Sequence, residues 1–147
     1  ANLQNGQGFR HSLYDKYIFS KVQAMLGGQI RVIVTGSAPI DKAVMELLKV
    51  CFACPIGEGY GLTETCASTT LTFMDDPESG CVGGPLVNSK IKLCDLPELN
   101  YLSTDNPPRG EICIFSPCVM EGYFDSPDMN SEVFIDGTRW FRTGDVG

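Results

Sequence analysis

The sequence is poor in histidine, tryptophan and basic residues. One histidine, His11, and one tryptophan stand among 147 residues. No motif places a serine or cysteine nucleophile beside His11, so we expect a surface or packing histidine rather than a catalytic base. The chain has eleven lysines and arginines but 18 aspartates and glutamates, which gives a formal net charge of −7. Because a nucleic-acid-binding domain normally carries a basic face, this balance argues against nucleic acid as a partner.

Long apolar runs are also missing. No stretch approaches the roughly 18 apolar residues of a membrane-spanning helix, and no basic region followed by an apolar core marks a signal peptide. Apolar residues nevertheless make up 43% of the chain and charged residues 20%, a balance typical of globular proteins. A chain of this length can bury a core of its own. We therefore expect a folded globular segment.

The seven cysteines are odd in number and irregularly spaced. This pattern is unlike the disulfide framework of a small secreted domain, and it fits a reducing compartment better. Cys51 and Cys54 have the Cys-x-x-Cys spacing of zinc and redox sites. No second pair stands at zinc-finger spacing, so we expect two small apolar residues at a helix end, with a zinc site as the less favoured alternative.

Apolar periodicity organises the first half of the chain. Apolar residues recur at helical spacing over residues 9–26, until a pair of glycines stops the pattern. The β-branched run of residues 30–35 predicts a buried parallel strand, and a helix with an apolar stripe is expected after Gly36-Ser37-Ala38-Pro39. A second strand then leads from Cys54 into a glycine-rich stretch. Strand, glycine turn and helix predict a partial doubly wound, parallel α/β unit, which binds ligands at the carboxyl ends of its strands.

The second half has a different pattern. Residues 74–80 are polar and rich in turn formers, so we place a subdomain boundary there. A short helix capped by Ser126 is expected over residues 126–132. Strands are expected over residues 90–93, 111–116 and 140–142. The sequence thus predicts an α/β subdomain over residues 1–77 and a small antiparallel β subdomain, open and barrel-like, over residues 78–147.

The densest group of candidate site residues is the run Gly57-Glu58-Gly59-Tyr60-Gly61-Leu62-Thr63-Glu64-Thr65. Its glycines let the backbone approach a ligand closely, and Tyr60 offers a flat face to a purine. Thr63 and Thr65 offer hydrogen-bond donors suited to phosphate oxygens, and Glu64 offers a hard oxygen ligand for Mg²⁺. The alternative is a glycine-rich turn before a helix capped by Thr63, in which Glu64 only favours the positive helix end.

Three motifs of this chain resemble those of the adenylate-forming superfamily, which includes acyl-CoA synthetases, luciferases and peptide-synthetase adenylation domains. Tyr60-Gly61-Leu62-Thr63-Glu64 resembles its Tyr-Gly-x-Thr-Glu motif. Gly36-Ser37-Ala38-Pro39 is similar to its adenine-side loop, and Trp140-Phe141-Arg142-Thr143-Gly144-Asp145 to its Thr-Gly-Asp motif. The motifs stand in the family's order, so the resemblance covers nearly the whole chain and implies part of the large N-terminal domain of such an enzyme.

The resemblance implies a role for each matching residue. Tyr60 stacks on the base, Thr63 contacts the α-phosphate, and Asp145 accepts hydrogen bonds from both ribose hydroxyls. Glu64 holds Mg²⁺, and Thr63 and Glu64 are the catalytic candidates. The full set of nucleotide-binding candidates is Ser37, Ala38, Pro39, Glu58, Gly59, Tyr60, Gly61, Thr63 and Asp145.

Val82-Gly83-Gly84-Pro85 and Glu98-Leu99-Asn100-Tyr101 are similar to eukaryotic long-chain fatty acyl-CoA synthetases. This resemblance implies that ATP activates a fatty acid to an acyl-adenylate and that coenzyme A then takes the acyl group. A medium-chain, aryl or luciferase-like enzyme is one alternative, and a non-catalytic nucleotide-binding module is another. Gly122-Tyr123-Phe124 resembles a further family motif that is mainly structural.

The chain starts at Ala1 and stops at Gly147, and we expect it to be a piece of a longer protein. The family's phosphate loop and its C-terminal adenylation lysine are not among these residues, so we expect residues 1–147 alone to be inactive. The resemblance implies a longer protein on the cytoplasmic side of the endoplasmic reticulum, peroxisome or mitochondrial outer membrane, associated through other parts of its chain. Its expected partners are a fatty acid, nucleotides and those other parts.

Overall fold

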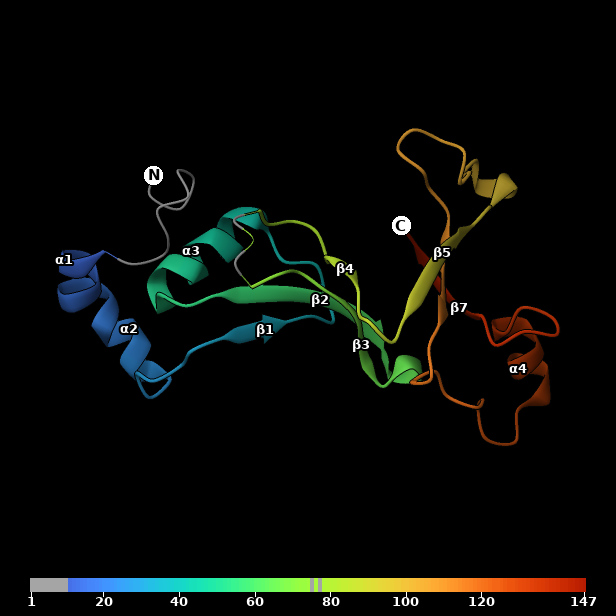
Figure 1. The fold of residues 1–147 in the computed structure, drawn as a ribbon, viewed down its shortest axis with the longest axis horizontal. Coiled ribbons are helices and arrows are strands. Elements are labelled where there is room, and N and C mark those ends of the chain that lie inside the picture. Colours follow the sequence, from blue (N-terminus) through green and yellow to red (C-terminus); the bar gives the residue numbers. More distant parts are fainter. Residues whose placement is uncertain (1–10, 75, 77) are drawn as a thin grey trace. The chain divides into compact units, whose positions relative to one another are not determined.

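The computed structural model describes residues 11–147 apart from 75 and 77, and Figure 1 labels its elements. The helices are α1 (Ser12–Tyr14), α2 (Ser20–Met25), α3 (Lys42–Phe52) and α4 (Pro127–Val133). The strands are β1 (Ile33–Thr35), β2 (Ile56–Leu62), β3 (Ala67–Leu71), β4 (Gly84–Pro85), β5 (Lys90–Cys94), β6 (Glu111–Phe115) and β7 (Phe141–Val146). A π-helical turn covers Asp15–Phe19, and 3₁₀ turns cover Thr63–Thr65 and Pro97–Leu99.

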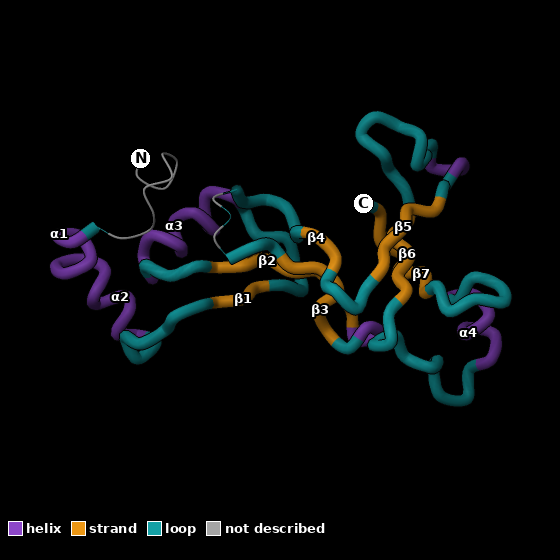
Figure 2. The backbone as a smooth tube through the Cα atoms, in the orientation of Figure 1, coloured by secondary structure: helices purple, strands orange, loops and turns teal. Residues whose placement is uncertain are grey.

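The chain divides into two compact units. The first ends at Tyr60 and also takes in Leu71–Gly84, and the second consists of Gly61–Thr70 and Pro85–Gly147. The strand order is β1-β2-β3-β4 in one sheet and β5-β6-β7 in the other, and the strands are orange in Figure 2. Pro77, beside the expected subdomain boundary, lies outside the described residues. Within the described part of the chain, no helix has both the length and the apolar run needed to cross a membrane.

The first helical segment ends where the sequence predicts. Helical turns run without a break from Ser12 to Met25, whereas the expected first residue, Phe9, lies outside the described residues. Gly27 and Gly28 have φ angles of 83° and 69°, a left-handed conformation that suits glycine and ends a helix. His11 is exposed, with its ring 4.7 Å from that of Tyr14. This environment agrees with the expected surface histidine.

The core of the first unit lies between α3 and the parallel pair β1–β2. Parallel pairing places Ile33 opposite Ile56 and Thr35 opposite Glu58. The Asp41 carboxylate caps α3 by accepting hydrogen bonds from the main-chain N–H groups of the first turn, as an N-cap residue does. The buried core residues are Met45, Cys54 and Ile56, with Ile33, Ile40, Leu48 and Phe52 packed against them. The burial of Cys54 at the end of α3 agrees with the expected apolar role.

Two predictions of burial in this unit are wrong. The strand predicted over residues 30–35 is shorter, and Val32 and Val34 are 50% and 57% exposed. On α3, Val44 and Leu47 of the expected apolar stripe are 46% and 59% exposed. A β-branched run or an apolar stripe indicates which side chains favour burial, but only neighbouring elements decide which face is covered.

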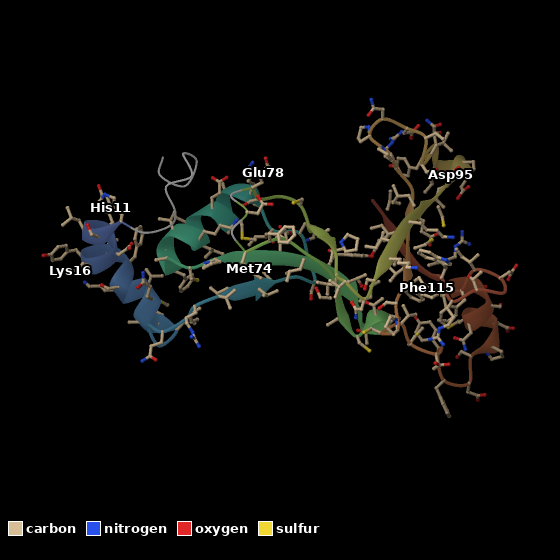
Figure 3. All side chains as sticks on the ribbon, viewed as in Figure 1. His11, Lys16, Met74, Glu78, Asp95 and Phe115 are labelled. Carbon is tan, nitrogen blue, oxygen red and sulfur yellow. The ribbon has the colours of Figure 1, made fainter. Side chains whose placement is uncertain are left out.

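Lys49 is a buried lysine that holds the connection between β3 and β4. Its side chain leaves α3 and is 3% exposed. Its ammonium donates to the carbonyl oxygens of Asp76 (3.3 Å) and Glu78 (3.5 Å) and to Oγ of Ser79 (3.2 Å). Figure 3 labels Glu78 on this connection. Three acceptors offset the cost of removing an ammonium group from water.

The sequence did not predict β3 or β4. In β3, Thr69 and Thr70 are buried although their side chains are polar. The carbonyl of Thr69 accepts a hydrogen bond from the N–H of Leu86 at 2.9 Å. Threonine favours strands, but Ala67–Leu71 lacks the alternation of apolar and polar residues that marks a half-buried strand. Two-residue β4 is too short to carry a pattern at all.

The second unit contains the expected antiparallel sheet. In the register of this sheet, Lys92 of β5 lies opposite Cys113 of β6, and Ile114 of β6 lies opposite Phe141 of β7. Ile114 and Phe141 are buried on one face. On the other face the Phe115 and Trp140 rings lie 5.7 Å apart. The described residues thus form an α/β fold with a parallel pair and a three-stranded antiparallel sheet, which does not close into a barrel.

The predicted helix over residues 126–132 corresponds to α4, but its expected cap is wrong. Ser126 holds the N-cap position without a side-chain hydrogen bond to the helix. Its hydroxyl donates instead to the carbonyl of Phe124 at 3.1 Å. A serine next to a turn can bond to the turn's backbone as readily as to the helix, which the sequence pattern does not distinguish.

We expect the cysteines to differ sharply in reactivity. The Cys113 thiol is fully buried and donates to Sγ of Cys94 at 2.8 Å. Burial, with the neighbouring Cys94, raises the pKa of Cys113 to about 12. Because the thiolate is the reactive form, iodoacetamide at pH 8 should label exposed Cys66 and Cys81 first and leave Cys113 unmodified until near pH 12. Peptide mass spectrometry of timed samples measures this order, and labelling of Cys113 as fast as Cys66 would contradict it.

Candidate functional site

The loop after β1 lies beside the glycine-rich part of β2 in the first unit. A Cβ added at Gly36 would lie 2.9 Å from the carbonyl oxygen of Gly59, so only glycine permits this approach without a shift. Ser37 follows with a φ of 71°. The structure therefore brings two groups of predicted nucleotide-binding residues together at the carboxyl end of β1. One group is Ser37, Ala38 and Pro39, and the other is Glu58, Gly59 and Tyr60.

Glu58 is a buried carboxylate in this wall. It is 6% exposed, and its Oε2 atom accepts no hydrogen bond from the described residues. Its main chain is fixed on Thr72, whose hydroxyl oxygen accepts from the Glu58 N–H and whose own N–H donates to the Glu58 carbonyl, both at 2.9 Å. A buried polar atom without a partner is costly, and such atoms concentrate at functional sites.

In the second unit, Glu64 lies in the tight 3₁₀ turn Thr63–Thr65. Thr65 is 1% exposed, and its hydroxyl is hydrogen-bonded to main-chain atoms of Leu62 and Ala67 at 3.0 Å. Thr65 therefore closes the turn and is not the phosphate donor that the sequence suggested. The alternative of a helix capped by Thr63 is also wrong, because the N-cap position belongs to Leu62 and Thr63 makes no cap. Thr63 itself is exposed.

The Glu64 carboxylate has a specific partner. The Tyr123 hydroxyl donates to Oε1 of Glu64 at 2.7 Å, across 59 residues of sequence. This hydrogen bond, with burial and the negative charge of Glu64, raises the pKa of Tyr123 above its ordinary value. Tyr123 thus remains a hydrogen-bond donor throughout the neutral pH range.

Asp145 lies in β7, in an irregular stretch of the strand that β6 holds in place. The Glu111 carboxylate accepts from Nε of Arg142 and from the N–H of Gly144, both at 3.1 Å. The Thr143 hydroxyl donates to the Ile112 carbonyl at 2.8 Å and accepts from the N–H of Asp145 at 3.1 Å. Asp145 itself is exposed, so its carboxylate is accessible to a ligand.

One cavity of the second unit joins two of the predicted motifs. Its volume is about 390 Å³, and Glu64 and Tyr123 line it together with Thr143 and Gly144. Further carboxylates on its wall belong to Glu98, Glu111 and Glu132. The lining of this cavity is acidic, and among the described residues that line it the basic side chain is that of Arg142. Such a lining suits a cation or a hydroxylated ligand better than a bare anion.

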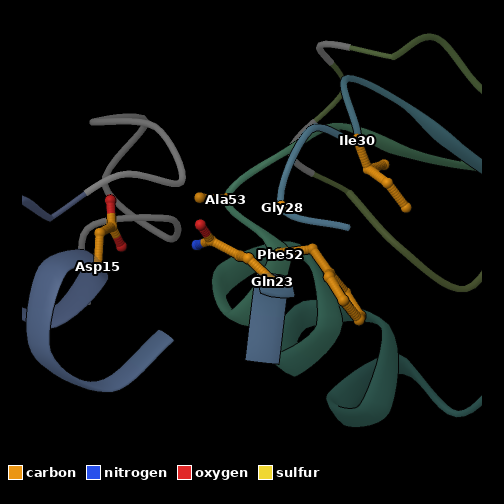
Figure 4. Close-up of a pocket in the computed structure, with 6 residues that line it drawn as sticks. All are labelled: Asp15, Gln23, Gly28, Ile30, Phe52 and Ala53. Carbon is orange, nitrogen blue, oxygen red and sulfur yellow. The ribbon is translucent and has the colours of Figure 1, made fainter. Parts of the chain in front are cut away.

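A second cavity has no connection with the predicted residues. It holds about 240 Å³ in the first unit, between α2 and the end of α3 (Figure 4). Gln23 lines it and donates from Nε2 to the Cys51 carbonyl at 3.3 Å. None of the nucleotide-binding candidates borders it. We therefore assign the site to the two motif regions described above.

Comparison with known protein families matches residues 6–124 to the family described as "AMP-binding enzyme". The chain belongs to the AMP-binding enzyme family. Among curated AMP-binding relatives, fatty acyl-CoA synthetase A of Dictyostelium discoideum is 45% identical over 92% of this chain and 20% of its own. The peroxisomal long chain acyl-CoA synthetase 7 of Arabidopsis thaliana is 42% identical over 92% of this chain and 19% of its own. The chain thus spans about a fifth of the length of these relatives.

A solved structure has the same AMP-binding fold. The A-PCP didomain of carboxylic acid reductase from Segniliparus rugosus, in complex with AMP, matches with a TM-score of 0.74 and 28% identity. The match covers 93% of this chain and 18% of that one. It supports the expected assignment of the fold to the N-terminal domain of adenylate-forming enzymes.

Sequence reasoning missed three residues that hold the motif residues of this AMP-binding chain. Glu111 holds Gly144 of β7 next to Asp145, Tyr123 holds Glu64, and Asn130 holds Tyr123. In the sequence, Gly122-Tyr123-Phe124 only resembles a mainly structural motif. A buried glutamate at the start of a strand is a weak signal of a partner, but no spacing in the sequence reveals contacts this far apart.

Proposed function

We propose that the full-length protein is an ATP-dependent, AMP-forming long-chain fatty acid–CoA ligase. It activates a fatty acid to an acyl-adenylate and transfers the acyl group to coenzyme A. The main support is the 45% identity to a fatty acyl-CoA synthetase over 92% of this chain. Supporting geometry comes from the cavity that Glu64 shares with Thr143 and Gly144 of β7.

The first unit supplies the groups proposed for the adenine. Oε2 of Glu58 is a buried acceptor without a donor among the described residues, and the exocyclic amine of adenine is a donor of the required kind. In the same wall, the main chains of Gly36 and Gly59 approach each other closely. We assign Ser37, Ala38 and Pro39 to one side of the base and Tyr60 to stacking.

Mg²⁺ fits the carboxylate of Glu64. Nowhere in the described residues do three histidine, cysteine, aspartate or glutamate side chains come together to hold a metal. Mg²⁺ typically takes one or two protein carboxylates, keeps waters and binds the phosphates of its substrate, so a single glutamate is sufficient. When bound, it neutralises charge on the phosphates as pyrophosphate leaves. Thr63, next to Glu64 and exposed, is assigned to the α-phosphate.

Asp145 is assigned to the ribose, and its loss should affect ATP affinity. We expect Asp145→Ala in the full-length enzyme to raise the KM for ATP by about tenfold, because two hydrogen bonds to ribose are lost. These contacts exist equally in the ground and transition states, so kcat should change little. Asp136→Ala, an exposed aspartate in the same unit, is the control. An altered fatty-acid profile with normal ATP kinetics would remove Asp145 from the ribose site.

A substrate panel tests the proposed function. The purified full-length protein is given saturated fatty acids from short to long, an aryl acid and luciferin, and AMP and acyl-CoA are measured. Preference for long chains supports the proposal, whereas a medium-chain, aryl or luciferin preference would assign another adenylate-forming enzyme. Absence of acid-dependent ATP–pyrophosphate exchange with every substrate would indicate a non-catalytic nucleotide-binding module.

The proposed location of the full-length protein is the cytoplasmic face of the endoplasmic reticulum, the peroxisome or the mitochondrial outer membrane. Two curated relatives carry "peroxisomal" in their names, which supports the peroxisome among the three. The proposed partners are a fatty acid, ATP and coenzyme A, together with the rest of its own chain.

A further inference from the structure

The segment between β6 and α4 holds Glu64 at two points. The N–H of Met120 donates to the Glu64 carbonyl at 2.8 Å. Three residues on, the Tyr123 hydroxyl donates to the Glu64 carboxylate at 2.7 Å. A short O–H bond to a charged oxygen is among the stronger hydrogen bonds in proteins. The main chain and the side chain of Glu64 are therefore both fixed by residues 120–123.

Tyr123 is itself clamped by a helix. Oδ1 of Asn130 in α4 accepts from the Tyr123 N–H at 2.7 Å, and Nδ2 of Asn130 donates to the Tyr123 carbonyl at 3.0 Å. The clamp requires a glycine before Tyr123, because a Cβ at Gly122 would lie 2.8 Å from the Asn130 amide atoms. The tyrosine is thus held at its backbone by α4 and at its hydroxyl by Glu64.

A glutamate side chain that only faces solvent does not require the hydrogen bonds that Met120 and Tyr123 make to Glu64. Fixing its torsions costs conformational entropy, and here the hydrogen bonds of the folded chain offset that cost before any ligand arrives. The Tyr123 bond occupies Oε1 of Glu64, and the second carboxylate oxygen, Oε2, takes no part in it. Hydrogen-bonded carboxylates of this kind are typical of metal sites, where the outer partner orients the ligand.

We infer that Tyr123 is a positioning residue for Glu64, and that Asn130 positions Tyr123 in turn. The segment resembling a mainly structural motif thereby acts on the reaction through the orientation of one carboxylate. This inference rests on the proposed function, because the orientation of Glu64 affects catalysis only if Glu64 acts at the phosphates.

The test compares two hydroxyl deletions in the full-length enzyme. Tyr123→Phe removes the bond to Glu64 and keeps the ring. Tyr101→Phe is the matched control, because Tyr101 is also half-buried in the second unit and its ring contacts Arg109 at 4.9 Å without a hydroxyl hydrogen bond in the described structure. ATP–pyrophosphate exchange is measured across a Mg²⁺ titration.

We expect Tyr123→Phe to raise the Mg²⁺ concentration for half-maximal exchange by about tenfold. This is the lower end of the range of losses caused by removing a residue that hydrogen-bonds to a metal ligand. Saturating Mg²⁺ should recover most of kcat. Asn130→Ala should shift the titration in the same direction by a smaller factor, and Tyr101→Phe should match the unmodified enzyme. A merely structural role would lower kcat and the melting temperature without moving the Mg²⁺ dependence.

A second readout needs no turnover. Binding of Mn²⁺ is measured by electron paramagnetic resonance in the presence of α,β-methylene-ATP. Tyr123→Phe should weaken it about tenfold, and the Glu64→Gln/Tyr123→Phe double variant should bind no more weakly than Glu64→Gln alone, because both changes remove one coupled pair.

The outcomes distinguish a failure of the proposed role of Glu64 from a failure of the positioning role of Tyr123. If Glu64→Gln leaves Mn²⁺ binding unchanged, the proposed role of Glu64 fails. If Glu64→Gln weakens binding while Tyr123→Phe behaves like Tyr101→Phe, the proposed function stands and the positioning role is overturned. Additive losses in the double variant would also overturn it. If Tyr123→Phe does not fold, a normal Mg²⁺ titration of a folded Asn130→Ala variant decides against the inference.

Discussion

Replacing Glu64 by glutamine in the full-length enzyme should slow the adenylation half-reaction by about 10²-fold or more. Glutamine keeps the size of the side chain and can still accept from the Tyr123 hydroxyl, but it removes the negative charge. Loss of a transition-state interaction of several kcal/mol has an effect of this size. Added Mg²⁺ should restore part of the rate, because a weaker ligand binds the ion less tightly.

The measurement assays the two half-reactions separately across a Mg²⁺ titration. Thioester formation from supplied acyl-adenylate should suffer much less than adenylation, because pyrophosphate has already left. Glu78→Gln is the matched control, since Glu78 is exposed (Figure 3) and lies in the other unit. Equal loss in both half-reactions, without rescue by Mg²⁺, would mean that Glu64 only stabilises its turn.

Replacing Gly61 by alanine should prevent normal folding of the second unit. A Cβ there would overlap the Ala67 carbonyl oxygen and lie 3.0 Å from Cα of Ser68. Both neighbours are backbone, so no side chain can move aside. We expect the free energy of unfolding to fall by more than about 3 kcal/mol, above the usual cost of overpacking, with a large drop in soluble yield.

Gly84→Ala is the matched control for this prediction. Gly84 is also a strand glycine, but an added Cβ there meets nothing within 4 Å. Thermal unfolding of both full-length variants, followed by circular dichroism, measures the difference. A Gly61→Ala variant that melts like Gly84→Ala would show that the turn after β2 relaxes more easily than the structure indicates.

Local patterns predicted the elements whose signal is contained in a few residues. The alternation at Lys90 to Leu93 became β5, and the glycines at positions 27 and 28 ended the first helical segment as capping rules predict. The exposure of Val34 was missed because it depends on what lies beside β1. The strand Ala67–Leu71 was missed because its buried side chains are threonines.

The candidate site was partly predictable for a similar reason. Three contiguous motifs carry their own signal, so the turn holding Glu64 and the part of β7 holding Asp145 could be named from sequence. The partners that orient them are separated from them in sequence. Tyr123 meets Glu64 across 59 residues, and Glu111 meets Gly144 across 33. Only the folded chain brings such pairs together, and neither residue has a local pattern that indicates its partner.

The clamp made by Lys49 determines where this part of the sequence can change during evolution. Two of its three acceptors are the main-chain carbonyls of Asp76 and Glu78, and every amino acid supplies a carbonyl. A substitution at position 78 therefore leaves its contact intact, whereas one at position 76 also removes the carboxylate that accepts from the Glu78 N–H at 2.8 Å. A substitution at position 49 removes the donor of all three contacts at once and leaves a vacancy inside the unit. Sequence drift is thus tolerated at position 78 of the loop and restricted at position 49, the donor of all three contacts, and at position 79, whose hydroxyl is the one side-chain acceptor.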